Sequence, residues 1–132
     1  MINRRQLFLG ITSLLTEPAF SRNLNDKLLL RTIPSSGERI PVIGMGTSRT
    51  FDLEPDENLG QLMEVLEAFF ISGGTVIDSS PMYGNAESTI GTLLSQLGFP
   101  HRYFAATKVW TTGKEEGIQQ MLLSEKRMNV KK

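Results

Sequence analysis

Short apolar runs alternate with longer stretches of helical periodicity along this chain. Residues 28–33 and 39–41 flank a Pro-Ser-Ser-Gly-Glu segment that is typical of a tight turn, and they predict a β-hairpin. Three later runs are short and rich in apolar or β-branched residues, and they predict strands at residues 42–46, 75–77 and 103–107. We therefore expect a hairpin followed by three strands.

Two amphipathic helices are expected between these strands, because apolar residues recur there at the spacing of one helix face. The first covers residues 56–72, with Asp56 as its N-cap and Gly73 as its stop. The second starts after Asn85, a candidate N-cap, and ends at Gly98. Its apolar face consists of Ile90, Leu93, Leu94 and Leu97.

A third helix is expected after the last strand. Thr112 and Glu115 match a capping box, in which two side chains satisfy the first backbone N–H groups of a helix. This helix carries Ile118, Met121 and Leu122. The complete order, a hairpin and then three strand–helix units, predicts an α/β fold with parallel strands and right-handed crossovers.

Chemistry-bearing side chains follow the predicted strands. Parallel strands place their carboxyl ends on one rim, where α/β folds keep their active sites. Thr47, Asp78 and Lys108 fall at these ends, and Tyr83 lies on the loop above the same rim. An ordinary tyrosine has a pKa of about 10, and a nearby ammonium lowers the pKa of a phenol. With a carboxylate to hold the lysine charged, this set can donate a proton to a carbonyl oxygen as a hydride reaches the carbon.

Each of these residues also has a purely structural interpretation. Asp78 can cap the turn that follows it, Lys108 can be a surface lysine with a buried stem, and Tyr83 can pack on its loop. The convergence of the three on one rim favours the chemical interpretation. His101, the one histidine of the sequence, precedes a strand and so belongs to the opposite face, where we expect a solvated loop residue.

Composition and charge narrow the class of protein and the partners and chemistry to be expected. The 132 residues are enough for one modest domain, and 39% hydrophobic with 21% charged residues indicate a globular chain. The 14 basic and 14 acidic side chains cancel, which argues against a nucleic acid or an anionic membrane as partner. The absence of cysteine from the sequence excludes disulfides, thiolate catalysis and cysteine-ligated metal sites.

The first 21 residues have a different character. Arg4 and Arg5 precede a mostly apolar run at residues 7–15, and Ala19-Phe20-Ser21 follows with the small-residue spacing of a signal-peptidase site. Paired arginines before such a run indicate twin-arginine export, and hence a periplasmic protein. The run is too short to span a bilayer, which takes about 20 apolar residues. The alternative is an N-terminal tail or a short surface helix on a cytoplasmic protein.

From residue 28 to residue 132 the chain resembles the aldo-keto reductases. The resemblance is carried by the opening hairpin, by Ile43-Gly44-Met45-Gly46-Thr47, by the Asp-Ser-x-x-x-Tyr-Gly-x-x-Glu segment from Asp78 to Glu87, and by Phe104-Ala105-Ala106-Thr107-Lys108-Val109-Trp110. It implies a partial (β/α)8 TIM barrel, made of the N-terminal hairpin that closes the barrel bottom and about the first three βα units.

Members of this family reduce aldehydes and ketones with NADPH and without a metal. The resemblance therefore implies NADP(H) as the cofactor and a small carbonyl compound as the substrate. The resemblance implies that Tyr83 is the proton donor and that Lys108 lowers the pKa of Tyr83. It also implies that Asp78 pairs with Lys108. The remaining residues that it assigns are Gly46, Thr47 and Ser48, placed with Asp78 at the nicotinamide end of the cofactor, and Trp110, an aromatic wall of the substrate pocket.

The sequence also departs from the family pattern. The family's fourth catalytic residue is a histidine at the end of the fourth strand, and further cofactor-binding segments come later still. Residues 126–132 resemble the lead-in to that strand, so we expect residues 28–132 to be the N-terminal part of a barrel of about 250 residues. Such a fragment is expected to be inactive alone. The alternatives are a nucleotide-sensing regulatory protein and a functionless truncated remnant, and the oligomeric state stays open.

Overall fold

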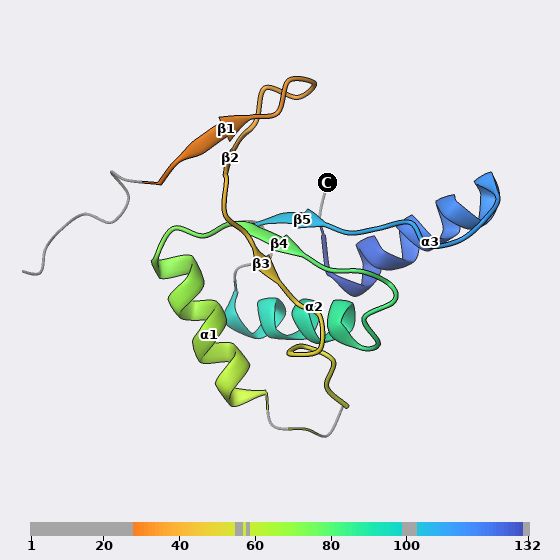
Figure 1. Cartoon of the computed structure of the whole chain (residues 1–132). Helices are drawn as coiled ribbons and strands as arrows, with labels where there is room; N and C mark the ends of the chain where they lie inside the picture. The colour runs from red at the N-terminus through yellow and green to blue at the C-terminus, as the bar shows by residue number, and fades with distance from the viewer. Residues whose placement is uncertain (1–27, 55–56, 58, 99–102, 131–132) are drawn as a thin grey trace, which may run out of the picture.

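A parallel sheet with the strand order β3–β4–β5 lies at the centre of the fold (Figure 1). The computed structural model describes residues 28–54, 57, 59–98 and 103–130. The strands of this sheet are β3 (Met45–Gly46), β4 (Val76–Asp78) and β5 (Phe104–Ala106). The helices that follow them in the chain are α1 (Gly60–Ile71), α2 (Ala86–Leu97) and α3 (Lys114–Arg127). The predicted order of three strand–helix units is confirmed.

A separate hairpin precedes the sheet. Its strands are β1 (Leu30–Thr32) and β2 (Arg39–Pro41), which pair antiparallel with Leu30 opposite Pro41. The turn between them contains Gly37 at φ 75°, a conformation that glycine adopts without steric cost. Figure 1 shows this hairpin standing apart from the three-stranded sheet. The predicted hairpin is therefore confirmed.

The register of the sheet decides which side chains share a face. Ile77 pairs with Met45 on one side and Ala105 on the other, while Asp78 pairs with Gly46 and Ala106. Because successive side chains of a strand point to opposite faces, Ile77 and Asp78 lie on different sides of the sheet. Ile77 is fully buried, so its face is the one that the helices cover.

The core lies between this face of the sheet and the helices. Helix α2 contacts both α1 and α3, and Figure 1 shows it running beneath the strands. The predicted apolar face of α2 supplies much of the core, since Ile90, Leu93 and Leu94 are fully buried. The remaining core residues are Phe51, Leu62, Leu66, Ile77, Ala86 and Met128.

Helices α2 and α3 approach closely at a glycine. A Cβ placed on Gly91 would lie 1.9 Å from the carbonyl oxygen of Arg127, a distance that no real contact allows. The absence of a side chain at Gly91 therefore lets the end of α3 rest on α2. The hydroxyl of Tyr103 donates a hydrogen bond of 2.5 Å to the carbonyl oxygen of Met128 in the same region. These contacts fix the end of α3.

Two predicted helix starts are wrong. Helix α1 begins at Gly60 rather than at residue 56, because a turn precedes it in which the Glu54 N–H donates to the Glu57 carboxylate at 2.6 Å. The N-cap predicted at Asp56 lies outside the described residues. The capping box of Thr112 is also wrong, because Gly113 occupies the N-cap of α3 and no side chain caps it. Gly113 has a φ of 98°, a conformation that threonine would rarely adopt.

The apolar residues predicted on the third helix are largely exposed. Met121 and Leu122 are 49% and 50% exposed, while the buried positions of α3 are Gly117 and Ser124. Strand β3 is also shorter than predicted, since it begins at Met45 and not at residue 42. Ile43, before the strand, is 76% exposed. Both results leave a large part of these apolar side chains in contact with solvent in the part of the chain that the structure describes.

Two further predictions fall on residues that the structure does not describe. The signal sequence at residues 1–21 and the placement of His101 both lie outside the described residues. Among the helices that are described, none is long and apolar enough to cross a membrane.

Candidate active site

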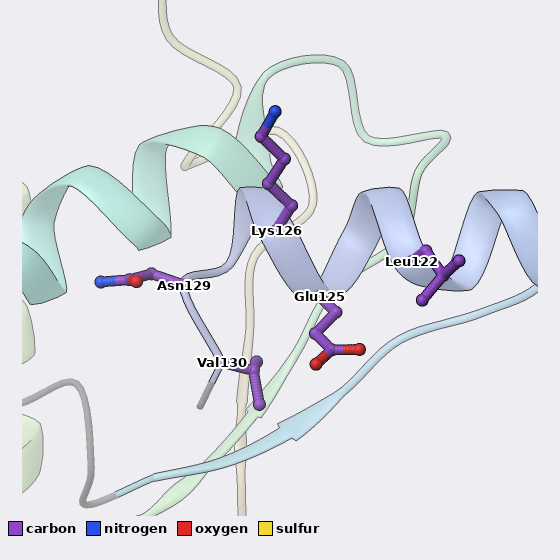
Figure 2. Close-up of a pocket in the computed structure, with 5 residues that line it drawn as sticks. All are labelled: Leu122, Glu125, Lys126, Asn129 and Val130. Atoms are coloured by element: carbon purple, nitrogen blue, oxygen red, sulfur yellow. The ribbon is translucent and has the colours of Figure 1, made fainter. Parts of the chain in front are cut away.

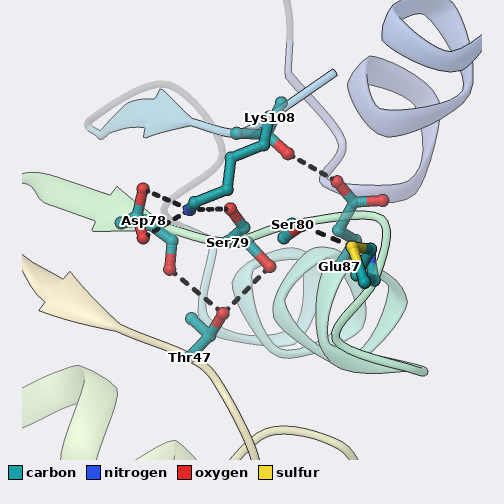
Figure 3. Close-up of polar contacts among 8 residues, drawn as sticks. Thr47, Asp78, Ser79, Ser80, Glu87 and Lys108 are labelled. Carbon is teal, nitrogen blue, oxygen red and sulfur yellow. Dashed lines mark hydrogen bonds and ion pairs between the residues drawn. The ribbon is translucent and has the colours of Figure 1, made fainter. Parts of the chain in front are cut away.

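Lys108 and Asp78 form an ion pair at the carboxyl ends of two neighbouring strands. Asp78 ends β4 and pairs with Ala106, so Lys108, two residues further along, continues on the same face of the sheet. Its Nζ donates to Oδ1 of Asp78 at 2.9 Å and to Oδ2 at 2.8 Å (Figure 3). A third hydrogen bond of 2.8 Å reaches the carbonyl oxygen of Ser79. The ammonium is thus held by three oxygens in one orientation.

This environment changes the acidity of Lys108. Partial burial alone would lower the pKa of Lys108, but the hydrogen bond and the negative charge of Asp78 raise it, with a smaller contribution from Tyr83. The net result is a Lys108 pKa above its usual value of 10.5. The side chain therefore carries a full positive charge at neutral pH, as an electrostatic partner of a phenol requires.

Tyr83 lies beside this ammonium. The Nζ of Lys108 is 5.2 Å from the centroid of the Tyr83 ring, and the ring packs in part against the hydrophobic core. The loop that carries Tyr83 is ordered by its backbone, since the Tyr83 N–H donates to the Ser80 carbonyl and the Tyr83 carbonyl accepts from Ala86. The structure thus brings together the three residues that the sequence predicts for proton transfer.

Asp52 holds the end of the same loop from a distant part of the chain. Its Oδ1 accepts a hydrogen bond of 2.8 Å from the backbone N–H of Asn85, at the N-terminus of α2. A Cβ on Gly84 would lie 2.0 Å from this oxygen, and Gly84 has a φ of 53°. Asn85 occupies the N-cap position as predicted, but its side chain makes no capping hydrogen bond. Glycine at position 84 is required both by the backbone and by the close approach of Asp52.

The predicted nicotinamide-binding residues lie at the end of β3. Gly46 is exposed, and a Cβ there would meet no atom within 4 Å, so open space lies beside Asp78. Ser48 is also exposed. Thr47 is fully buried, and its hydroxyl contacts the carbonyl oxygen of Asp78 at 3.1 Å and the hydroxyl of Ser79 at 2.9 Å. Thr47 therefore ties β3 to β4 from beneath the rim, and a contact between Thr47 and a cofactor stays a prediction.

Trp110 lies on the loop after β5. Its side chain is 65% exposed, and it lines an open hollow with Val109, Thr111 and Thr112. The backbone N–H of Trp110 donates to the side-chain oxygen of Gln120 on α3 at 2.5 Å. The indole is thus largely exposed to solvent, and its role as a wall of a substrate pocket stays a prediction.

A second hollow lies at the end of α3, and Figure 2 shows the side chains around it. It is lined by Leu122, Glu125, Lys126, Asn129 and Val130. It shares no residue with the Tyr83, Lys108 and Asp78 group. We assign it no role in the chemistry of the rim.

Sequence reasoning missed several residues that support the site. The carbonyl oxygen of Ser79 accepts a hydrogen bond from Lys108, and the hydroxyl of Ser79 accepts one from Thr47. Asp52 holds the end of the Tyr83 loop. The buried carboxylate of Glu87 accepts a hydrogen bond from Thr107. Ser79 and Glu87 fall inside the Asp-Ser-x-x-x-Tyr-Gly-x-x-Glu segment, so the motif itself was a signal for them. Asp52 gave no signal, because its partner lies 33 residues away.

The arrangement is suited to donating a proton. A phenol lies next to a fixed positive charge, and that charge is held by a carboxylate on the neighbouring strand. Such a charge stabilises a phenolate as the proton leaves. Among the described residues, no group of three or more histidine, aspartate or glutamate side chains is arranged to hold a metal ion.

Comparisons with known proteins point to one family. Residues 42–132 match the model of the aldo/keto reductase family. An aldo-keto reductase from Klebsiella pneumoniae, solved in complex with NADPH, is 25% identical with a TM-score of 0.62, over 78% of this chain and 37% of that chain. A second Klebsiella pneumoniae structure, an aldo/keto reductase in complex with NADP and acetate, is 26% identical with a TM-score of 0.58, over 71% of this chain and 33% of that chain.

A Pseudomonas aeruginosa chain, likewise assigned to the aldo-keto reductases, has a TM-score of 0.66 at 22% identity, over 84% of this chain and 46% of that chain. At that identity the likeness shows the fold alone. The chain spans less than half the length of each of these solved chains, so its sheet and helices form part of a (β/α)8 barrel, as predicted. No curated protein sequence matched the chain.

Proposed function

The chain belongs to the aldo/keto reductase family, and on this premise we propose that it serves the NADPH-dependent reduction of an aldehyde or ketone to an alcohol. The observation that carries the proposal is the position of the Lys108 ammonium, 5.2 Å from the Tyr83 ring and bonded to both carboxylate oxygens of Asp78. Two solved relatives contain NADP or NADPH, which supports the choice of cofactor.

The chain's own residues supply the proton. Tyr83 gives its phenolic proton to the carbonyl oxygen of the substrate, and the oxygen becomes the hydroxyl of the product. Lys108 stabilises the phenolate that this step leaves on Tyr83, because a positive charge close to an anion favours its charged form. Asp78 keeps Lys108 charged and oriented. NADPH, when bound, supplies the hydride to the carbonyl carbon.

The rim fits the nicotinamide end of this cofactor. A flat ring needs open space next to the proton donor, and the exposed Gly46 leaves such space beside Asp78. Gly46, Ser48 and Asp78 would hold the ring there, and Thr47 would support them from below through its bonds to the end of β4. Trp110 would form one wall of the pocket for the carbonyl compound.

We also propose that residues 1–132 by themselves do not turn over NADPH. More than half of the length of each of these solved relatives has no counterpart in this chain. Among the residues that the structure describes, the outer edges of β3 and β5 have no strand partner, although a closed barrel pairs every strand on both sides. Oxidation of NADPH by the purified chain, followed by absorbance in the presence of an aldehyde, would contradict this part of the proposal.

A chimera tests the reductase function directly. In it, residues 42–132 replace the matching segment of the Klebsiella pneumoniae reductase that was solved with NADPH, so that the rest of the barrel is present. We expect aldehyde-dependent oxidation of NADPH, and we expect its loss in the Tyr83→Phe and Lys108→Met versions of the chimera.

The outcomes of this test separate the candidate functions. A folded chimera that binds NADPH but does not oxidise it overturns the reductase proposal and favours a nucleotide-sensing role. A Tyr83→Phe chimera that keeps full activity overturns the assignment of the proton donor. Binding is measured by the fluorescence of NADPH and folding by circular dichroism, so both controls are independent of activity.

We further propose, from the sequence alone, that residues 1–21 direct twin-arginine export to the periplasm. The support is the order of Arg4, Arg5 and the apolar run at residues 7–15. A reporter fused to residues 1–21 should appear in the periplasm, and replacement of both arginines by lysine should keep it in the cytoplasm. A fusion that stays cytoplasmic with its arginines intact would refute export.

A further inference from the structure

A buried carboxylate lies outside the proton-donating group. Glu87, in the first turn of α2, is only 1% exposed, and it is the one acidic side chain buried to this degree among the described residues. Burying a carboxylate is costly unless other groups bond to it. The partners of Glu87 should therefore show what the residue does.

Glu87 has two partners, and they come from two different elements. The hydroxyl of Thr107 donates to Oε1 at 2.8 Å, and Nη1 of Arg127 lies 3.6 Å from Oε2. Thr107 follows β5 directly, and Arg127 is the last residue of α3. The carboxylate thus joins the start of α2 to the end of β5 and to the end of α3.

Both segments joined by the Thr107 bond carry residues of the proton-donating group. Glu87 lies four positions after Tyr83, on the helix that the Tyr83 loop leads into. Thr107 is the residue before Lys108, and in an extended segment the two side chains point to opposite faces. Lys108 reaches Asp78 on one face of the sheet, while Thr107 reaches Glu87 on the face that the helices cover.

This geometry constrains the end of β5 from both sides at once. If Thr107 turned away from α2, one oxygen of a buried carboxylate would lose its hydrogen-bond donor, and that loss is unfavourable. The backbone at positions 107 and 108 is therefore held, and with it the starting point of the Lys108 side chain. A rotation of this segment would move the ammonium away from both Asp78 and the Tyr83 ring.

We propose that Glu87, through Thr107, is a positioning residue that sets the place of Lys108 relative to Asp78 and Tyr83. This proposal rests on the proposed reductase function, since it concerns the same proton-donating group. The two contacts of Glu87 have different roles in this proposal. The bond to Thr107 positions Lys108, whereas the contact with Arg127 only joins α2 to α3.

The test measures the reactivity of the Lys108 amine in the protein of residues 1–132. Acetylation of Lys108 is followed by mass spectrometry as a function of pH, and the midpoint reports how firmly Asp78 holds the ammonium. Asp78→Asn serves as the reference, because it removes the carboxylate that raises the pKa of Lys108. Thr107→Val removes the hydroxyl but keeps the shape of the side chain, and Thr107→Ser restores the hydroxyl.

We expect Thr107→Val to shift the midpoint in the same direction as Asp78→Asn. A shift of about half a pH unit increases the reactive fraction of the amine about threefold at neutral pH. Thr107→Ser should leave the profile as in the wild type. Two controls should do the same: Arg127→Gln, which keeps the Thr107 bond, and Thr92→Val, which removes a threonine bond of 2.9 Å to the Ser88 carbonyl elsewhere on α2.

The outcomes distinguish the two proposals. If Asp78→Asn leaves the Lys108 profile unchanged, the ion pair of the proposed function fails, and the positioning role fails with it. If Asp78→Asn shifts the profile and a folded Thr107→Val does not, only the positioning role is overturned. Should Thr107→Val fail to fold, Glu87→Asp takes its place, because it withdraws the carboxylate by one methylene, and an unchanged profile again overturns the proposal.

Discussion

Asp78 and Lys108 are 30 residues apart in the sequence, yet Nζ of Lys108 donates to both carboxylate oxygens of Asp78. The two side chains are 49% and 40% exposed, so water screens their attraction. An exposed pair of this kind stabilises a fold by about 0.5 kcal/mol. The pair is therefore a device for orienting an ammonium more than a source of stability.

The pH dependence of that small contribution can be predicted. Because the folded state raises the pKa of Lys108 above 10.5, the stabilisation is fully present below that pH and is lost as the pH rises through the folded pKa. Lys108→Met and Asp78→Asn should each lower the free energy of unfolding in urea at pH 8, by about 0.5 kcal/mol. The double variant should cost little more than either single variant. Additive losses would show that the two residues act independently.

Tyr103 provides a larger effect at alkaline pH. Burial raises the pKa of Tyr103 from 10.0 to about 12, and its hydroxyl donates to the Met128 carbonyl. Tyr103→Phe should cost about 1 kcal/mol of stability at pH 8, where the phenol is protonated in both states. Above pH 10 the unfolded chain loses its Tyr103 proton first, so between pH 10 and pH 12 the wild type should lose more stability than the variant does. The measurement is urea unfolding of both proteins. A difference in their free energies of unfolding that stays the same from pH 8 to pH 12 would contradict this prediction.

Gly91 should be intolerant of a methyl group. A Cβ there would lie 1.9 Å from the Arg127 carbonyl oxygen, so α2 and α3 would have to separate. Gly91→Ala should lower the free energy of unfolding by about 1–3 kcal/mol, although alanine is the better helix former. The matched control is Gly46→Ala, since a Cβ at Gly46 would meet no atom within 4 Å. Equal thermal unfolding of the two variants would refute the close contact.

Asp52 should protect the amide at the start of α2. Asp52→Ala removes the acceptor of the Asn85 N–H and should cost about 1 kcal/mol, as the loss of a helix N-cap does. Asp52→Asn keeps an oxygen at the same place and should cost less. Hydrogen exchange at the Asn85 amide measures the effect directly, and it should be faster in Asp52→Ala than in Asp52→Asn. The same rate in both would show that the carboxylate is not the acceptor.

The order of elements was predictable because each signal is local. A β-branched run ending in Asp78 predicts a buried strand with an acid at its end, and β4 is Val76–Asp78. Gly98 stops α2 in the left-handed conformation, as its sequence position indicates. Once three parallel strands are accepted, the meeting of Asp78 and Lys108 on one rim follows from the topology. The fold and the contact between Asp78 and Lys108 could therefore be predicted together.

The errors arose where a distant or neighbouring group replaced the expected local one. The N–H of Asn85 is satisfied by Asp52 from another loop, and no periodicity reveals such a bond. Gly113 takes the N-cap that the pattern gave to Thr112, because the backbone there has a φ of 98°. The burial of Glu87, for which the sequence analysis made no prediction, depends on Thr107 and Arg127, which come later in the chain.

The pairing of β4 with β5 has a consequence for how the chemistry can be moved between proteins. Asp78, Tyr83 and Lys108 all belong to one strand–helix–strand unit, and the bond that closes the group spans 30 residues. Contacts at such short separation form with a small entropic cost of closing the intervening loop. These three side chains can therefore be inherited or transplanted together, as one contiguous segment of the chain.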